Sequence, residues 1–167
     1  MIGGKPVKNK VLMFVDMQKG FMYNKLYEKL SNKISYLIAN GEYDLVIATK
    51  FINKDDSLYE TKLNWKNLKD EESQKFSFEL PNGVLIFEKY GYGLDIKQIN
   101  KLKKLDIKEI DLCGVEADAC VYAIALQLFD NGIFPNILIN YVETSNSLKD
   151  AAKEMMIRQF GSVDEKI

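Results

Sequence analysis

Three side chains that could take part in chemistry each follow an apolar run of the sequence. Asp16 closes the run "VLMFV", Lys89 closes "GVLIFE", and Cys120 lies shortly after "IDLCG". A thiol, a carboxylate and an ammonium group together can perform nucleophilic catalysis, in which the thiol attacks and the acid moves protons. Each residue also has a simpler interpretation. Asp16 and Lys89 could mark solvated strand ends, and cysteine is among the most commonly buried residue types.

The two cysteines are interpreted differently. Cys113 lies inside the apolar run "IDLCG", where a buried thiol packs like a small hydrophobic side chain. Cys120 follows Asp118 by two positions, and aspartate is a common N-cap of helices. We therefore expect Asp118 to cap a helix whose first turn contains Cys120. There the helix dipole and the ammonium group of Lys89 would both favour a thiolate.

The chain contains no histidine, and this absence excludes several mechanisms. Ser-His-Asp and Cys-His hydrolysis, imidazole acid–base catalysis and every metal site that requires a histidine ligand are ruled out. Any chemistry must therefore use cysteine, lysine, aspartate, glutamate or tyrosine side chains.

Length and composition are those of an ordinary globular protein, for which a single domain over residues 1–167 is expected. The 167 residues are 47% hydrophobic and 28% charged. Lys and Arg number 23 against 24 Asp and Glu, a net charge of −1, so no nucleic-acid partner is expected. No run approaches the ~18 apolar residues of a membrane-spanning helix. With two cysteines that suit reduced thiols, we expect a cytoplasmic protein without a membrane partner.

Apolar runs and helical periodicities alternate along the chain. The runs lack the strict alternation of a half-exposed strand, as strands buried on both faces do. Residues 53–80 lose periodicity and form the longest irregular segment, and the tail 162–167 is either an edge strand or a frayed end. Strands are predicted over 10–16, 43–50, 83–89, 107–114 and 135–141, and helices over 25–40, 95–105, 118–131 and from Ser147, which forms a loose capping box with Asp150.

This alternation predicts a parallel sheet covered by helices on both faces. All strands of such a sheet point the same way, so the loops that leave their carboxyl ends gather along one edge, where ligands bind. Asp16, Lys89 and Cys120 all fall at those ends. The fold would therefore bring the three side chains together although they lie far apart in the sequence.

Three segments resemble motifs of the isochorismatase-like cysteine hydrolases, a superfamily that includes nicotinamidases and N-carbamoylsarcosine amidase. They are "VLMFVDMQKGF", "FEKYGYG" and, most specifically, "GVEADACV", and they occur in the expected order between about Val11 and Gly161. The resemblance implies a three-layer α/β/α sandwich with a mainly parallel, about six-stranded, Rossmann-like sheet. It also implies that one hydrolase domain occupies nearly the whole chain.

The resemblance further implies roles for individual residues. Cys120, Asp16 and Lys89 would form a catalytic triad, and a cis peptide between Val115 and Glu116 would help to direct the backbone N–H groups of Glu116 and Cys120 at an oxyanion. Cys120 would attack a carboxamide or ureido carbonyl, and Asp16 would carry the thiol proton to the leaving amine. Lys89 would hold thiolate and carboxylate in position, and water would hydrolyse the thioester.

The sequence departs from the nicotinamidase pattern at the place where those enzymes hold a metal on an aspartate and histidines. The segment here is "TKFINKD", with Phe51 in place of the aspartate and Asn53 in place of a histidine. We therefore expect no metal and no other cofactor, and nicotinamide becomes a less favoured substrate. Glu116 stands where small residues are usual. Its carboxylate either points away from the anion hole or selects a cationic or amide-bearing substrate.

Four aromatic residues are candidates for a substrate-binding wall because they lie near the motifs or in the long irregular segment. They are Phe51, Trp65, Tyr90 and Tyr122. Each could instead pack in the core or at a subunit interface, and the resemblance implies a homodimer or higher homo-oligomer. The sequence favours a metal-independent cysteine hydrolase of a small amide or ureide. The alternative is a non-catalytic small-molecule-binding or thiol-sensing protein on the same fold.

Overall fold

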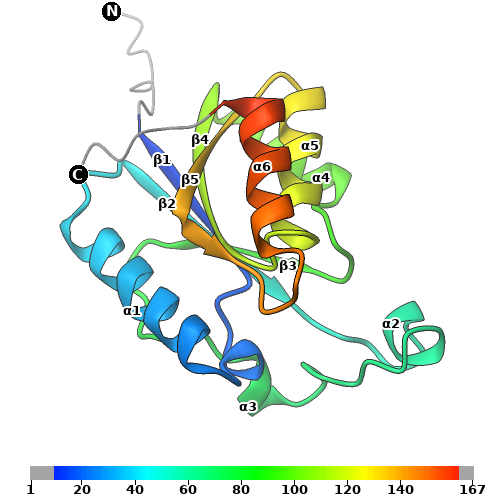
Figure 1. Cartoon of the computed structure of the whole chain (residues 1–167). Coiled ribbons are helices and arrows are strands. Elements are labelled where there is room, and N and C mark those ends of the chain that lie inside the picture. Colours follow the sequence, from blue (N-terminus) through cyan, green and yellow to red (C-terminus); the bar gives the residue numbers. More distant parts are fainter. Residues whose placement is uncertain (1–9, 162–167) are drawn as a thin grey trace, which may run out of the picture.

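The computed structural model describes residues 10–161, in which strands and helices alternate as predicted (Figure 1). Five strands form one parallel sheet in this part of the chain, so the predicted count of about six is corrected. The tail 162–167, a candidate edge strand, lies outside the described residues. The strands are β1 (Val11–Val15), β2 (Leu45–Phe51), β3 (Leu85–Lys89), β4 (Glu109–Val115) and β5 (Phe134–Glu143).

The strand order β3-β2-β1-β4-β5 puts β1 at the centre of the sheet. From β1 the chain moves outward to β2 and β3, and it then crosses to the other side of β1 for β4 and β5. Open parallel sheets bind ligands at the carboxyl ends of the strands where the direction of winding reverses, here between β1 and β4. Asp16 directly follows β1 and Glu116 directly follows β4. Both residues therefore lie at the position where this topology favours a site.

Helices cover both faces of the sheet, which confirms the predicted three-layer arrangement (Figure 1). On one face α1 (Lys25–Asn40) packs over Leu12 and Phe14. On the other, Val11 and Met13 belong to the core formed with α4 (Ile96–Lys104), α5 (Cys120–Asp130) and α6 (Lys149–Phe160). Successive residues of β1 point to opposite faces and all are buried, which explains the continuous apolar run in the sequence.

Local sequence accounts for the start of two helices. Asn24 caps α1, because its side chain accepts the amide N–H of Tyr27 at 2.9 Å. Asp95 and Gln98 form a reciprocal capping box at the start of α4. Each cap satisfies amide groups that would otherwise lack a partner and contributes about 1 kcal/mol. These two helices match their predicted ranges to within a residue at each end.

The starts of α5 and α6 differ from prediction. Ala119, not Asp118, is the N-cap of α5, and Leu148, not Ser147, is the N-cap of α6; neither cap makes a side-chain hydrogen bond. Asn146 explains both differences, since its Nδ2 donates to Asp118 Oδ2 at 2.8 Å and its Oδ1 accepts from the amide N–H of Leu148 at 2.8 Å. A contact between distant segments thus replaces the expected cap by Asp118, and a local bond to Asn146 replaces the expected cap by Ser147.

The long segment between β2 and β3 carries two short helices, α2 (Leu58–Thr61) and α3 (Glu71–Gln74), where only irregular chain was expected. Gln18, just before the 3₁₀ turn η1 (Lys19–Phe21), ties this segment to the sheet. Its side chain accepts from the amide N–H of Phe51 at 2.8 Å and donates to the carbonyl oxygens of Phe51 at 2.9 Å and Gln74 at 3.0 Å. Gln18 is fully buried, so these bonds fix the loop that follows β2.

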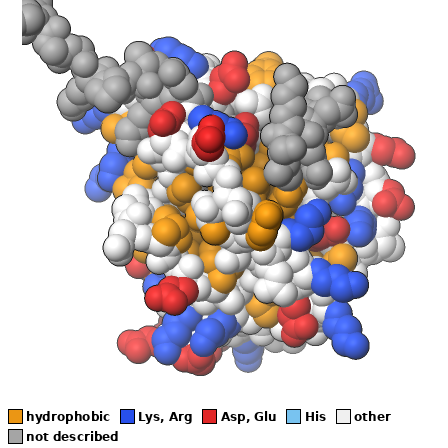
Figure 2. Space-filling view, turned by 90° about the vertical axis from the view of Figure 1, so that its left-hand side faces the viewer, with side chains coloured by type: hydrophobic (Ala, Val, Ile, Leu, Met, Phe, Trp, Pro, Cys, Tyr) orange, Lys and Arg blue, Asp and Glu red, His pale blue; other side chains and the backbone are white. Residues whose placement is uncertain are grey.

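The surface seen in Figure 2 carries acidic and basic side chains around its margin and hydrophobic side chains nearer its middle. Charges of both signs are interspersed, in keeping with the net charge of −1. This face therefore lacks the extended basic surface that binds phosphate backbones. Between residues 10 and 161, no helix combines the length and the apolar character needed to cross a membrane.

Candidate active site

The structure brings Asp16, Lys89 and Cys120 together from the carboxyl ends of three strands. Lys89, the last residue of β3, places Nζ 2.8 Å from Asp16 Oδ2 and donates to Cys120 Sγ at 3.4 Å. The exposed fractions are 0% for Asp16, 2% for Lys89 and 7% for Cys120. A carboxylate, an ammonium group and a thiol thus form one cluster that is shielded from most solvent.

Lys89 is held by the glycine-rich turn that follows it. Its Nζ also donates to the carbonyl oxygens of Gly91 at 2.9 Å and Tyr92 at 3.3 Å, and it lies 4.9 Å from the centre of the Phe51 ring. Burial lowers the pKa of Lys89, but the negative charge of Asp16, together with the adjacent sulfur of Cys120, raises it by more, so that the pKa lies above its ordinary value. Lys89 is therefore a fixed cation at the centre of the cluster.

Asp16 is oriented by Thr49 of β2. The Thr49 hydroxyl donates to Asp16 Oδ1 at 2.6 Å and accepts from the amide N–H of Asp16 at 3.1 Å. The backbone of Asp16 is left-handed, with φ of 52°, a conformation that aspartate tolerates better than most residues. Thr49 is completely buried. Both the backbone and the carboxylate of Asp16 are thus positioned by one side chain.

The second carboxylate oxygen of Asp16 retains a free lone pair. Oδ2 forms the 2.8 Å ion pair with Lys89 Nζ, a contact without the geometry of a well-directed hydrogen bond. An ionised carboxylate has about four acceptor positions. An unused one close to a thiol gives Asp16 the capacity to accept the thiol proton.

The expectation that Cys120 rests as a thiolate is not met. Burial, followed by the negative charge of Asp16, raises the pKa of Cys120 to about 12, and the opposing effect of Lys89 is smaller. The helix start does not compensate for the loss of water around the sulfur. Cys120 is therefore a neutral thiol at rest, and it must give up its proton as it attacks.

Two backbone amides next to the thiol are unoccupied. The peptide between Val115 and Glu116 is cis, and Cys120 is the first residue of α5. Within residues 10–161, neither the amide N–H of Glu116 nor that of Cys120 donates a hydrogen bond. Neighbouring amides are used, since Ala119 and Val121 both donate to the carbonyl oxygen of Glu116, each at 3.1 Å. These two free N–H groups, in the turn before α5 and at its first residue, stay the candidates for an oxyanion hole.

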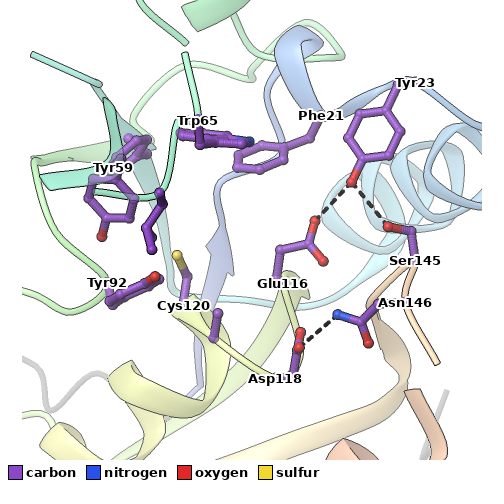
Figure 3. Close-up of a pocket in the computed structure, with 13 residues that line it drawn as sticks. Phe21, Tyr23, Tyr59, Trp65, Tyr92, Glu116, Asp118, Cys120, Ser145 and Asn146 are labelled. Carbon is purple, nitrogen blue, oxygen red and sulfur yellow. Dashed lines mark hydrogen bonds between the residues drawn. The ribbon is translucent and has the colours of Figure 1, made fainter. Parts of the chain in front are cut away.

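A pocket of about 400 Å³ opens in front of Cys120 (Figure 3). Its volume falls in the range of small-molecule sites. The sulfur of Cys120 points into the space between aromatic rings on one side and the Glu116 side chain on the other. The lining residues lie at the carboxyl ends of the five strands of the described sheet or in the segments that follow them. They are Phe21, Tyr23, Phe51, Tyr59, Leu63, Trp65, Tyr92, Glu116, Asp118, Ala119, Cys120, Ser145 and Asn146.

Two of the four expected substrate-binding aromatics lie on this wall and two do not. Phe51 and Trp65 line the pocket, with ring centres 5.8 Å apart. Tyr90 is half exposed and its ring lies under Lys54 Nζ, 3.6 Å away. Tyr122 packs against the core on the α5 side of the sheet. Proximity in sequence to Lys89 and Cys120 therefore does not give proximity to the pocket for Tyr90 and Tyr122.

Glu116 turns its carboxylate toward hydroxyl groups on the pocket side. Oε2 accepts from Tyr27 Oη at 2.5 Å and from Thr144 Oγ1 at 2.8 Å, and Oε1 accepts from Tyr23 Oη at 3.3 Å. Burial raises the pKa of Glu116, the bonds from Tyr27 and Thr144 oppose this rise, and the charge of Asp118 adds to it. Glu116 lines the pocket, and whether its carboxylate selects a substrate stays a prediction.

The residues at the expected metal position do not fit a metal ion. The Phe51 ring has no ligand atom, and the Asn53 amide is already used, since Nδ2 donates to the carbonyl oxygens of Trp65 and Asn67 and Oδ1 accepts from Ser57 Oγ. No group of three or more His, Cys, Asp or Glu side chains within residues 10–161 could hold a metal. Phe51 and Asn53, which stand where the metal ligands would be, therefore stabilise the loop and do not bind a metal.

Several site residues were missed in the sequence. Thr49 ends the apolar run "VIAT", and Thr144, Ser145 and Asn146 directly follow β5. All four are polar residues at the carboxyl end of a parallel strand, so the rule that located Asp16 applies to the second and fifth strands as well. The pocket aromatics Phe21, Tyr59 and Tyr92 carry no comparable signal, because aromatic residues are equally common in cores.

Several solved structures share this fold. The pyrazinamidase of Pyrococcus horikoshii in complex with zinc superposes with a TM-score of 0.77 at 18% identity, covering 95% of this chain and 99% of that one. PnC1 from L. infantum in complex with nicotinate gives 0.80 at 16% identity, covering 94% and 92%. N-carbamoylsarcosine amidase from Thermoplasma acidophilum gives 0.68 at 19% identity, covering 92% and 94%. At such identities the similarity establishes the fold.

Sequence comparison identifies the family. No curated protein sequence matches the chain at a significant level, but residues 10–164 match the isochorismatase domain. The match includes all five strands and the segments that carry Asp16, Lys89 and Cys120. It covers nearly all of the 167 residues, and the chain therefore belongs to the isochorismatase family.

Proposed function

We propose that the protein is a metal-independent, cysteine-dependent hydrolase of the C–N bond of a small carboxamide or ureido compound. One observation carries the proposal. Lys89 Nζ contacts both Asp16 Oδ2, at 2.8 Å, and Cys120 Sγ, at 3.4 Å, beside a pocket of suitable size. The family match and the amidases among the structures of the same fold point to the same class of reaction.

The first step forms a bond between Cys120 Sγ and the substrate carbonyl carbon. Because the resting thiol is neutral, its proton moves to the free lone pair of Asp16 Oδ2 as the sulfur attacks. Lys89 remains protonated and stabilises the negative charge on whichever partner carries it, first the carboxylate and then the sulfur. The step thus needs no separate histidine base.

The tetrahedral anion is stabilised by the backbone N–H groups of Glu116 and Cys120, which have no competing acceptor in the described chain. One such donor is commonly worth about 3–4 kcal/mol of barrier. Asp16 returns the proton to the leaving nitrogen, the C–N bond breaks, and ammonia or an amine departs. An acyl thioester on Cys120 remains.

The second step uses water and restores the enzyme. Asp16 accepts a proton from the attacking water, whose oxygen forms a bond to the thioester carbonyl carbon. The C–S bond then breaks, and the proton on Asp16 passes to the departing sulfur. A carboxylic or carbamic acid leaves, so one water is consumed for each C–N bond broken.

The test is the release of ammonia from a panel of small carboxamides and ureides by the wild type, by Cys120→Ala and by the matched control Cys113→Ala. The wild type and the Cys113 variant are expected to hydrolyse at least one compound, and the Cys120 variant to fall by about 10³-fold or more. Retained activity in Cys120→Ala would refute the cysteine mechanism.

Metal independence is tested by elemental analysis and chelation. The purified protein is expected to contain less than stoichiometric zinc, iron or manganese and to keep its activity in excess chelator. Phe51 has no ligand atom, and the Asn53 amide is engaged in hydrogen bonds within the loop. Stoichiometric metal together with activity lost on chelation and restored by the ion would refute this part of the proposal.

A thiol-sensing role is less well supported. Redox-sensing cysteines are accessible and ionised, whereas Cys120 is 7% exposed and burial raises its pKa to about 12. The sensing role would be favoured if iodoacetamide labelled Cys120 readily while no amide or ureide was hydrolysed.

A further inference from the structure

The pocket in front of Cys120 has an unbalanced charge. Its wall includes the carboxylates of Glu116 and Asp118, and none of the residues that line it is lysine or arginine. Lys89 does not offset this charge, because it does not line the pocket, is 2% exposed and is paired with Asp16. The potential inside the pocket is therefore negative, which repels anions and favours cations.

The groups that hold the two carboxylates are neutral. Glu116 accepts from the hydroxyls of Tyr27, Thr144 and Tyr23, and Asp118 accepts from the amide of Asn146. Such donors orient a carboxylate without cancelling its charge. Among residues 10–161, Glu116 Oε1 receives only the 3.3 Å bond from Tyr23 (Figure 3), so it keeps the capacity to accept another donor. A neutral ligand would leave both charges uncompensated.

The opposite wall is built from aromatic rings in mutual contact. The Trp65 ring centre lies 6.1 Å from that of Phe21 and 5.9 Å from that of Tyr59, and Tyr59 lies 5.1 Å from Tyr92. The faces of aromatic rings attract cations, and ammonium and guanidinium groups bind well between several rings. Carboxylate and aromatic walls thus favour the same kind of ligand from opposite sides of the pocket (Figure 3).

We propose that the substrate is an amide or ureide that also bears a cationic ammonium or guanidinium group, which binds between Glu116 and the aromatic wall while its carbonyl lies at Cys120. This inference rests on the proposed hydrolysis and names the substrate class. In this proposal the backbone and the side chain of Glu116 have different roles. Its backbone N–H faces the oxyanion, and its side chain selects the charge of the substrate.

The kinetic test compares three amides that differ only at the far end: 5-aminopentanamide (cation), hexanamide (neutral) and adipamate (anion), with shorter and longer homologues of each. For the wild type, kcat/KM of the best cationic amide is expected to exceed that of its neutral partner by about tenfold or more, and the anionic amide to be poorest. In Glu116→Gln the cation-to-neutral ratio is expected to fall close to one. The variant Glu154→Gln, which changes an exposed carboxylate on α6, is the control and should keep the cation-to-neutral ratio of the wild type.

A binding test separates this inference from the hydrolysis itself. Calorimetry of the wild type and of Cys120→Ala with the same amides, without any need for turnover, is expected to show preferential binding of the cation. Equal or weaker binding of the cation would overturn the inference even if amides are hydrolysed. Preferential binding of the cation without hydrolysis would support the charge selection and refute the proposed reaction. A cation-to-neutral ratio of kcat/KM in Glu116→Gln equal to that of the wild type would show that Glu116 does not select the charge of the substrate.

Discussion

At the scale of single residues, the proposed mechanism depends on where the proton rests. The buried carboxylate of Asp16 and the buried ammonium group of Lys89 compensate each other, which leaves the thiol of Cys120 as the neutral third member. The thiol pKa of about 12 follows from burial and from Asp16. Attack and proton transfer to Asp16 must therefore occur together.

This arrangement makes two properties of Cys120 respond in opposite ways to one substitution. Because the charge of Asp16 raises the thiol pKa, Asp16→Asn is expected to speed iodoacetamide labelling of Cys120 at about pH 8, whereas it abolishes amide hydrolysis by removing the base. Because Lys89 lowers the thiol pKa, Lys89→Met should slow both reactions. Labelling of the wild type should rise about tenfold per pH unit between pH 7 and 10.

The labelling rates are measured by peptide mapping, with the fully buried Cys113 as an internal reference for unfolding. A labelling rate that is already independent of pH near pH 8 would show a resting thiolate and contradict the proton arrangement. Faster hydrolysis in Asp16→Asn would contradict the role of Asp16 as base.

Thr49 is expected to act by positioning Asp16. Thr49→Val removes the hydroxyl that donates to Oδ1 and accepts from the Asp16 amide, so we expect a loss of about 1–3 kcal/mol in the free energy of unfolding and a fall in kcat of about 10-fold to 100-fold with little change in KM. Thr49→Ser, which keeps the hydroxyl, should retain most of the free energy of unfolding and most of kcat. A valine variant with wild-type kcat and pH profile would show that Thr49 is only structural.

The positions of the reactive residues were predictable and their state was not. Asp16, Lys89 and Cys120 could be placed together because each ends or follows an apolar run, and parallel strands share one functional edge. The protonation of Cys120 could not be predicted, because it depends on burial by segments distant in sequence. The same limit applies to Tyr90 and Tyr122, which are adjacent to site residues but lie off the pocket wall.

At the scale of elements, the site requires close contact between β4 and β1. Gly114 of β4 pairs with Val15 of β1, has φ of 117°, and a Cβ there would lie 2.3 Å from the carbonyl oxygen of Val15. Only glycine allows this approach. The turn that carries Glu116 and Cys120 is thereby held next to Asp16.

Gly114→Ala is expected to lower the free energy of unfolding by about 3 kcal/mol or more, since it combines a steric clash with an unfavourable backbone conformation. The matched control is Gly83→Ala, where φ is also positive, at 87°, but nothing lies within 4 Å of the added Cβ; it should cost only about 1 kcal/mol. Denaturant unfolding measures both. Equal losses would show that the close approach to Val15 is unimportant.

Element boundaries followed from the sequence wherever local signals acted alone. The ranges of α1 and α4 were predicted from their apolar periodicity, and the strands were predicted from their apolar runs. Asp118 bonds instead to Asn146, 28 positions away, a contact that no local pattern encodes. At the start of α6 the side chain of Asn146, not that of Ser147, accepts an amide N–H, that of Leu148. The short helices α2 and α3 have no buried residues, which is why they leave no hydrophobic periodicity in the sequence.

At the scale of the whole molecule, we propose one domain that encloses one site. Both faces of the sheet carry a hydrophobic core, and the pocket draws on segments that follow β1, β2, β3, β4 and β5. Apolar side chains also remain exposed over α5 and the start of β5, where Phe129 is 50% and Phe134 38% exposed with ring centres 6.3 Å apart. Such a pair is a candidate for a subunit contact.

We therefore predict a homodimer or higher homo-oligomer in which Phe129 is buried. Light scattering after size exclusion should give at least twice the 19.2 kDa mass of the chain, and Phe129→Glu should shift the mass toward the monomer without unfolding the protein. Tyr36→Glu, also at an exposed aromatic residue but on α1, is the control and should leave the mass unchanged. A monomer at all concentrations would contradict the prediction.

The most direct measurement of the central claim is intact mass spectrometry of the enzyme quenched in acid during turnover of a primary amide. We predict a species heavier than the free chain by the mass of the amide minus ammonia, located on Cys120 by peptide mapping, with Cys120→Ala forming no adduct and no product. Hydrolysis of the same amide by Cys120→Ala, at a rate near that of the wild type and with no adduct on either protein, would contradict the account.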